Sequence, residues 1–179
     1  MSSVPPPKNF GEHFAADVIK RSKQKILLLR ETATSMTWAT FVTTEWASAL
    51  RSALRQLLTQ LRPPNTTRQA SCRVDNASAL KSLTADQCLS DLGVTLDLSN
   101  PANKNGNPCA EKAIRELHDA IKSVNSSGQG LSSEELASAV SLLNSRPRWS
   151  TMSAIELWTG RDMLTGETLL FDQHQLIQA

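Results

Sequence analysis

Two stretches decide the fold, SCRVDN at residues 71–76 and NPCAEK at residues 107–112. The first ends an apolar run typical of a buried strand, so we expect Asp75 at the end of that strand. The second opens a helix, because proline suits the first helical turn and apolar residues recur from Ala110 at intervals of three and four. Thirty-five residues separate Asp75 from Glu111. A carboxylate at the carboxyl end of a strand is where open α/β sheets place ligand chemistry.

A third carboxylate, Asp17, lies inside the earlier apolar stretch 12–19, which has the composition of a strand. Burying a carboxylate is strongly unfavourable unless it is paired or bound to a metal. Asp17 is therefore expected at a strand end, in a cleft, or both. The alternative is an exposed edge strand on which Asp17 is solvated.

Two more strands are predicted directly after this one, at residues 25–30 and 37–42, and the short polar segments between them indicate an antiparallel meander. A helix follows, with Thr44 as its expected cap and Pro63-Pro64 as its end. Two strands joined by a helical crossover lie parallel, so the strand at 71–75 can pair with the first strand of the meander. Asp17 would then lie beside the aspartate that ends the later strand.

The rest of the chain is predicted to be mostly helical. The expected elements are helices at 77–83 and 86–92, a strand at 94–98, a polar loop at 99–107, a helix from 108 to 124, a connector at 125–130, a helix opened by a capping box at Ser132 and Glu135, and a short helix at 153–158. The last residues, 161–179, give a weak and mixed signal.

Composition bounds the class of protein. A chain of 179 residues with 40% hydrophobic content can form one domain with a real core, and its net charge of +2 does not by itself imply a nucleic-acid partner. Three widely spaced cysteines fit neither a disulfide framework nor a zinc site, which favours a reducing compartment. No stretch approaches the roughly 20 apolar residues of a membrane span, and the start lacks the apolar core of a signal peptide.

Three acidic residues that converge without histidine or cysteine favour hard cations, Mg²⁺ or Mn²⁺, over zinc. Two such ions can clamp the attacking and leaving oxygens of a phosphoryl transfer. The alternative is that Asp17, Asp75 and Glu111 are three unrelated surface acids among seventeen.

Local sequences support the first of these alternatives. The chain resembles the catalytic core of retroviral and LTR-retrotransposon integrases, most of all a Gypsy-type element, over about residues 12–172. The similar segments are FAAD at 14–17, RVDNA at 73–77, NP at 107–108 before AEK at 110–112, and LNSR at 143–146 before SAIEL at 153–157.

The resemblance implies an α/β, ribonuclease-H-like fold with a five-stranded mixed sheet flanked by helices. It implies a linker or N-terminal extension at 1–11, the catalytic core at 12–160 and a C-terminal extension at 161–179. It also implies that Asp17, Asp75 and Glu111 are the catalytic residues and hold two Mg²⁺ or Mn²⁺ ions.

DNA contacts follow from the same resemblance. They are expected at Asn107, Lys112, Arg115, His118 and Lys122, with the loop 99–107 positioning the DNA end. His118 departs from the lysine more usual there. Glu31 is a second departure, since such elements often carry aspartate there, but it follows the second strand and is expected to be non-catalytic.

The implied partners are the element-end DNA and target DNA, together with further copies of the chain in a homodimer or larger homo-oligomer, in the nucleus and without a membrane. The family also carries a zinc-binding N-terminal domain and a C-terminal DNA-binding domain, and a core without them is expected to be weak in full integration. A different class remains open, a host-adopted or decayed core that binds DNA or protein without catalysis. A ribonuclease-H-type nuclease is disfavoured by the spacing to Glu111 and its Asn-Pro lead-in.

Overall fold

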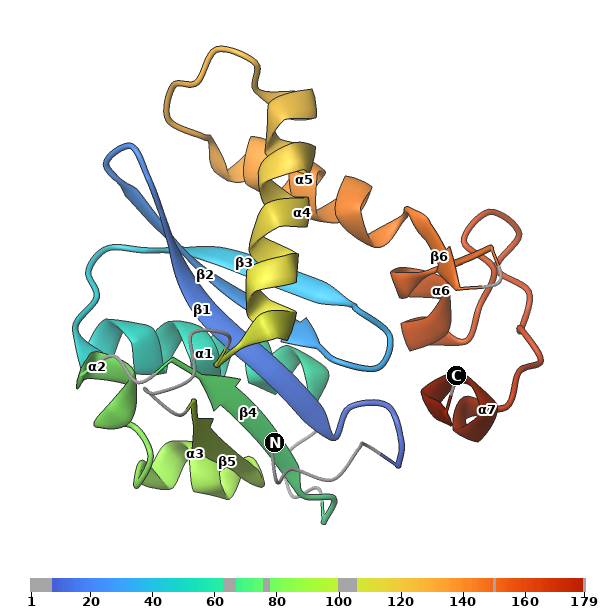
Figure 1. Cartoon of the computed structure of the whole chain (residues 1–179), viewed down its shortest axis with the longest axis horizontal. Coiled ribbons are helices and arrows are strands. Elements are labelled where there is room, and N and C mark those ends of the chain that lie inside the picture. Colours follow the sequence, from blue (N-terminus) through green and yellow to red (C-terminus); the bar gives the residue numbers. More distant parts are fainter. Residues whose placement is uncertain (1–7, 63–66, 76–77, 100–105, 150, 179) are drawn as a thin grey trace.

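The computed structural model describes residues 8–62, 67–75, 78–99, 106–149 and 151–178. Its centre is a five-stranded mixed sheet with helices on both faces (Figure 1). The strands of this sheet are β1 (His13–Arg21), β2 (Gln24–Glu31), β3 (Thr37–Val42), β4 (Ala70–Val74) and β5 (Val94–Leu98).

Helices and one small sheet complete the described structure. The helices are α1 (Ala47–Leu61), α2 (Ser78–Lys81), α3 (Gln87–Asp91), α4 (Pro108–Val124), α5 (Ser133–Asn144), α6 (Ala154–Thr159) and α7 (Gln173–Gln178). The small sheet pairs β6 (Pro147–Trp149) with β7 (Met152–Ser153). Among the described residues, no helix is both long and apolar enough to cross a bilayer.

The strand order of the main sheet is β3-β2-β1-β4-β5. The first three strands form the antiparallel meander expected from the sequence, whereas β4 pairs parallel with β1, and β5 pairs parallel with β4. α1 is the crossover that carries the chain from β3 to β4. The predicted α/β, ribonuclease-H-like fold with a five-stranded mixed sheet flanked by helices is confirmed.

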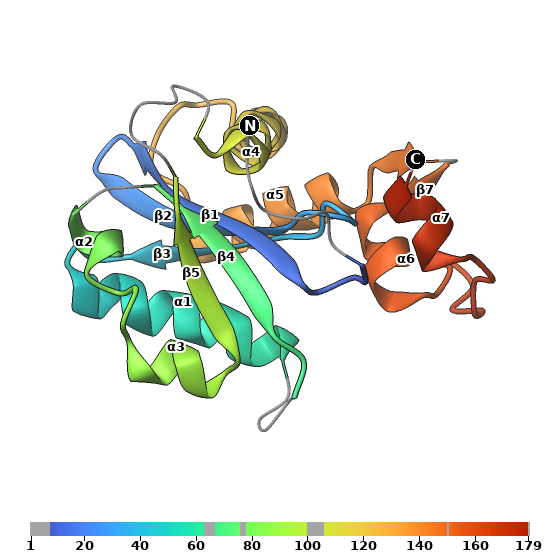
Figure 2. The same ribbon diagram turned by 60° about the horizontal axis from the view of Figure 1, so that its bottom comes forward.

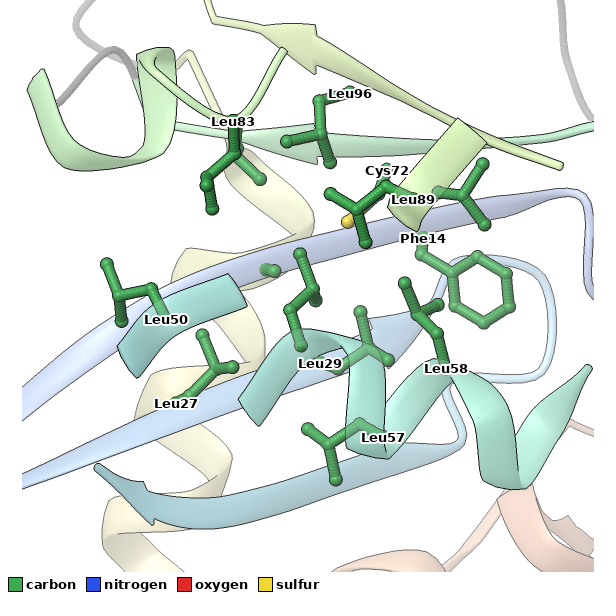
Figure 3. Packing of buried hydrophobic residues seen from close by; sticks show 14 of the residues in the cluster. Phe14, Leu27, Leu29, Leu50, Leu57, Leu58, Cys72, Leu83, Leu89 and Leu96 are labelled. Carbon is green, nitrogen blue, oxygen red and sulfur yellow. The ribbon is translucent and has the colours of Figure 1, made fainter. Parts of the chain in front are cut away.

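Both faces of the sheet are apolar. Successive residues of β2 point to opposite sides, and its central residues are all apolar, so they supply both faces. Leu27 and Leu29 join the core under α1, which includes Leu50, Leu57 and Leu58 (Figure 3). Leu28, which lies between them in the sequence, faces a second core that α4 and α5 form on the other side of the sheet (Figure 2). Each fully buried leucine contributes about 2 kcal/mol, so these two cores dominate the packing that fixes the sheet.

The second core holds α4 in place over β1 and β2. Its helical residues repeat with the predicted period and are Ala113, Leu117, Ala120 and Ile121 of α4 and Leu136, Ala139 and Leu143 of α5. The predicted capping box at the start of α5 is confirmed, since Ser132 Oγ accepts from the N–H of Glu135 and the Glu135 carboxylate accepts from the N–H of Ser132.

Some predicted boundaries were wrong. α1 begins at Ala47 and its N-cap is Trp46, not Thr44, because the Trp46 carbonyl accepts the first helical hydrogen bond, from Leu50. Trp46 makes no side-chain cap and is 75% exposed. The short elements β6, β7 and α7 were not predicted. Most of the loop predicted at 99–107 lies outside the described residues.

Candidate active site

Asp17 and Asp75 lie beside each other where β4 ends next to β1. Ala16 pairs with Val74 in the parallel register, and Asp75 follows Val74 directly. β1 continues to Arg21, so Asp17 is in the middle of its own strand and not at its end. The strand that ends at this point is β4. Among the described residues, Asp17 therefore has no strand partner on the β4 side, while on the other side it pairs with Leu28 of β2.

The pKa of Asp17 is raised, first by the burial of its carboxyl group and then by the negative charges of Asp75 and Glu111. A hydrogen bond of 2.7 Å from the N–H of Val18 to Asp17 Oδ1 opposes the rise. Salt largely screens exposed charges that are more than about 10 Å apart, so the effect of Asp75 and Glu111 on Asp17 is one of near neighbours. Asp17 is half-buried, whereas Asp75 and Glu111 are exposed, so the region opens to solvent.

Asn107 fixes the start of α4 against the sheet. Its Nδ2 donates to the carbonyl of Ala16 at 3.1 Å and to the carbonyl of Arg73 at 3.4 Å, and its own carbonyl accepts from the N–H of Glu111 at 3.0 Å. The side chain of Asn107, 6% exposed, thus connects the backbone of β1 and β4, while its main-chain carbonyl accepts the first hydrogen bond of α4. Asn107 was predicted as a DNA contact, and that contact stays a prediction. The structure gives its amide nitrogen a positioning role.

Ser99, which follows β5, orients Asp75 and was not predicted as part of the site. It is buried, its N–H donates to the carbonyl of Val74 at 3.0 Å, and its Oγ donates to Asp75 Oδ1 at 3.2 Å. A serine at the start of a polar loop carries no sequence signal for this role. Ser99 lies next to Asp75 because β4 pairs parallel with β5, with Val74 opposite Leu98.

The donor set of the three acids fits hard divalent cations, which prefer carboxylate oxygens. Within the described part of the chain, no three Asp, Glu, His or Cys side chains lie close enough together to hold one ion. Because Asp75 and Glu111 are exposed, rotation about their side-chain torsions is the change that would bring their oxygens toward Asp17.

Basic side chains follow Glu111 along the solvent side of α4. Lys112, Arg115 and Lys122 are exposed, and His118 is half-buried. Positions 111, 115, 118 and 122 recur at the spacing of one helical stripe, and the residues that pack on the sheet lie on the other side of the helix. Contacts of this stripe with DNA stay predictions.

A buried ion network connects α4 to β2 and β6 and was not predicted. Arg30 of β2, 1% exposed, donates from Nη2 to Glu116 Oε2 at 2.5 Å and from Nε to Thr37 Oγ1 at 2.8 Å. Arg148 of β6 donates to both carboxylate oxygens of Glu116, at 3.2 and 2.8 Å. Burial opposes ionisation of Glu116, but the two guanidinium groups outweigh it and lower the pKa to about 2.

Glu31 is the last residue of β2, three residues beyond Leu28, which pairs with Asp17. It is fully buried and accepts hydrogen bonds from the N–H of Gly11 at 3.2 Å and from the N–H and Oγ1 of Thr34, both at 2.6 Å. Burial raises the pKa of its carboxyl group. The structure therefore gives Glu31 a turn-stabilising position away from the three acids.

Neither a protein-family profile nor a curated protein matches the sequence. Among solved structures, the catalytic core domain of BIV integrase superposes with a TM-score of 0.66 and 19% sequence identity, over 83% of this chain and 93% of that chain. The chain has the fold of a retroviral integrase catalytic core. An integrase-fold chain in the simian T-cell lymphotropic virus intasome, solved with the PP2A regulatory subunit B56 gamma, gives a TM-score of 0.70 and 14% identity over 94% of this chain and 61% of that chain. At such identities the likeness establishes the fold.

The integrase-core fold accounts for the layout of the site. It places Asp17 in the central strand, Asp75 after the next strand and Glu111 on the first turn of the helix that crosses that face. The catalytic role of the three residues, which the sequence resemblance implied, stays a prediction.

Proposed function

We propose that the chain is a divalent-metal-dependent polynucleotidyl transferase, an integrase core that trims the ends of element DNA and joins them to target DNA. The observation that supports this most is that Asp75 and Glu111 are both near enough to Asp17 for their charges to add to the rise in its pKa, which burial causes first. The integrase-core fold supports it further, because β1, the end of β4 and the first turn of α4 each carry one of the three acids.

In this proposal Asp17, Asp75 and Glu111 hold two Mg²⁺ or Mn²⁺ ions through their carboxylate oxygens. Such ions, when bound, lower the pKa of the attacking water or hydroxyl group and stabilise charge on the leaving oxygen. The chain itself supplies position. Asn107 holds the helix of Glu111 to the two strands, and Ser99 holds the side chain of Asp75.

The DNA would lie along the solvent side of α4. Phosphates would be contacted there by Lys112, Arg115, His118 and Lys122. Asn107, at the start of the helix, would contact the DNA end. Phosphate contacts give affinity that depends on salt and little on sequence. We propose that the chain acts on element-end and target DNA in the nucleus as a homodimer or a larger homo-oligomer.

Metal binding should be measurable apart from catalysis. Mn²⁺ at about 100 times its Kd should stabilise the wild-type fold by about 2.7 kcal/mol, because the ion binds only the folded site. The Asp75→Asn and Glu111→Gln variants should lose most of this gain, whereas Glu134→Gln, an exposed carboxylate on α5, should keep it. Thermal unfolding with increasing Mn²⁺ checks this. Equal stabilisation of all four proteins would contradict a site made by these acids.

Arg115 should contribute to DNA affinity through a phosphate. Arg115→Gln should weaken binding to a short duplex and reduce the slope of log affinity against log salt by about 0.9. Arg55→Gln is the matched control, because Arg55 is exposed on α1, on the opposite face of the sheet (Figure 2). Fluorescence anisotropy at several salt concentrations gives both slopes. An unchanged slope for Arg115→Gln would remove this residue from the DNA interface.

The second candidate is a non-catalytic, host-adopted or decayed integrase core that binds DNA or protein. One observation favours it, namely that no three acidic, histidine or cysteine side chains of the described residues are close enough to share an ion. A chain that binds DNA through α4 but gains no stability from Mn²⁺ would have this function.

A further inference from the structure

A cavity of about 250 Å³ lies at the start of β1, away from the three acids. Its walls come from segments far apart in the sequence, namely the chain before β1, the end of α1, α6 and α7. Phe10, Phe14 and Trp158 supply aromatic surface, and Arg62 and Arg68 supply positive charge. Neither the acids nor the basic side of α4 contributes to it.

The aromatic wall is held by further ring contacts. Trp158 packs edge-to-face on Trp38, with ring centroids 5.3 Å apart and planes at 78°. Phe10 packs against Phe171 at 6.1 Å. Such pairs stabilise one orientation of each ring, so the wall is present before any ligand binds.

Gly11 brings the backbone against this wall. Its φ of +79° favours glycine, and an added Cβ would lie 3.4 Å from the Trp158 ring. Its N–H donates to Glu31 Oε1, and its carbonyl accepts from Arg62 Nη1 at 3.1 Å. The backbone between the ring and the guanidinium group is thus fixed from both sides.

Arg62 brings positive charge to the cavity without a neutralising carboxylate. It is 6% exposed and donates to the carbonyls of Leu92, Gly11 and Arg68, which supply only partial negative charge. Among the described residues no carboxylate forms an ion pair with it, and burial and the neighbouring Arg68 lower its pKa. Arginine has five N–H groups, so two remain beyond these three bonds.

Arg68 adds a second guanidinium group at the mouth. Its side chain is 59% exposed and lies 3.8 Å from the carboxylate of Glu12, the acid paired with it. Glu12 also accepts hydrogen bonds from the N–H groups of Lys8 and Asn9 and from the side chain of Asn9. A second carboxylate, Glu31, lies behind Gly11 but accepts hydrogen bonds from Gly11 and Thr34 and not from either arginine, so the guanidinium groups of Arg62 and Arg68 line the cavity beside an aromatic surface.

We propose that this cavity binds an aromatic anion, a carboxylate or phosphate group attached to a flat apolar ring. The anionic group would pair with Arg62 and Arg68, and the ring would stack against Trp158 and Phe14. A buried guanidinium group gains most from a full negative charge, and planar oxyanions match its N–H geometry. The site is separate from the proposed transferase centre and does not depend on that activity.

Indole N–H signals in NMR spectra of the whole chain test the proposal, with benzoate, phenyl phosphate and neutral benzamide as probes. Benzoate or phenyl phosphate should shift the Trp158 signal, which a Trp158→Phe variant assigns. Trp46 should not respond, because it lies at the other end of α1, about 22 Å away. Benzamide should bind about tenfold more weakly than the better anion.

A variant pair separates the cavity from general charge. Arg68→Gln should lower the affinity for the anion about fivefold to tenfold, and Arg55→Gln should leave this affinity unchanged. Arg62 is left intact, because its carbonyl bonds hold the surrounding backbone. Preference for benzoate or for phenyl phosphate identifies the anionic group. Equal binding of benzamide, equal loss in both variants, or no Trp158 shift with either anion would overturn the proposal.

Discussion

DNA that carries an element end should be nicked about a thousandfold more slowly by Asp75→Asn or Glu111→Gln than by the wild-type chain in Mn²⁺. Each substitution replaces a charged ligand by a neutral amide of the same shape. Losing several kcal/mol of metal-derived stabilisation of the transition state corresponds to about this factor. Nicking and strand transfer on labelled duplexes measure it, and Glu134→Gln should retain the wild-type rate.

Asp17→Asn separates a catalytic effect from a folding effect. It should lose activity to the same extent while unfolding at a higher temperature than wild type without metal. The reason is that burial and two neighbouring negative charges disfavour the ionised Asp17 carboxylate. Because the folded-state pKa is raised, ionised Asp17 reduces stability as pH rises above its ordinary value of 3.8, and the asparagine variant should lack this loss. Full activity in all three variants would exclude these acids from catalysis.

Glu116→Gln should lower the free energy of unfolding by about 3 kcal/mol. Removing the charge leaves the guanidinium groups of Arg30 and Arg148, with side chains 1% and 12% exposed, facing a neutral amide. The lower end of the usual range for a broken buried pair applies, because the Glu116 side chain itself is 21% exposed. Urea unfolding measures the change, and Glu134→Gln should stay within about 0.5 kcal/mol of wild type.

The same network should have a signature in acid. The pKa of Glu116 falls from an ordinary value of 4.5 to about 2 in the folded chain. Its contribution is therefore complete above pH 4.5 and is lost as pH falls toward 2. The free energy of unfolding of Glu116→Gln should therefore depend less on pH across that interval than that of the wild type. If the free energy of unfolding changes with pH in the same way for both proteins, the network contributes little to stability.

The sheet could be predicted from the sequence because its strands carry continuous or alternating apolar runs, and α1 and α4 carry a clear helical period. The helical crossover predicted that β4 pairs parallel with β1, whereas the place of β5 beside β4 was not predicted. β6 and β7 could not be predicted, because two or three residues are too few to show a period. The start of α1 was misplaced because Thr44 resembles a cap, while the backbone turns into the helix at Trp46.

The three acids could be proposed from spacing and resemblance, but their supports could not. Arg30, Glu116 and Arg148 come from β2, α4 and β6, and only the folded chain brings them together. Asn107 had a usable signal, since an asparagine directly before a proline at a helix start is a frequent cap position. Its side chain nevertheless bonds to β1 and β4 and not to its own helix.

The strand order β3-β2-β1-β4-β5 also sets the order in which the site can assemble during synthesis. The meander contains contacts between neighbours in the sequence and can form first, carrying Asp17 alone. Asp75 joins when β4 docks, and Glu111 only after α4 has left the ribosome. Repulsion between Asp17 and Asp75 therefore begins when β4 docks, and Glu111 adds to it only as α4 and α5 form the second core, whose apolar packing opposes it.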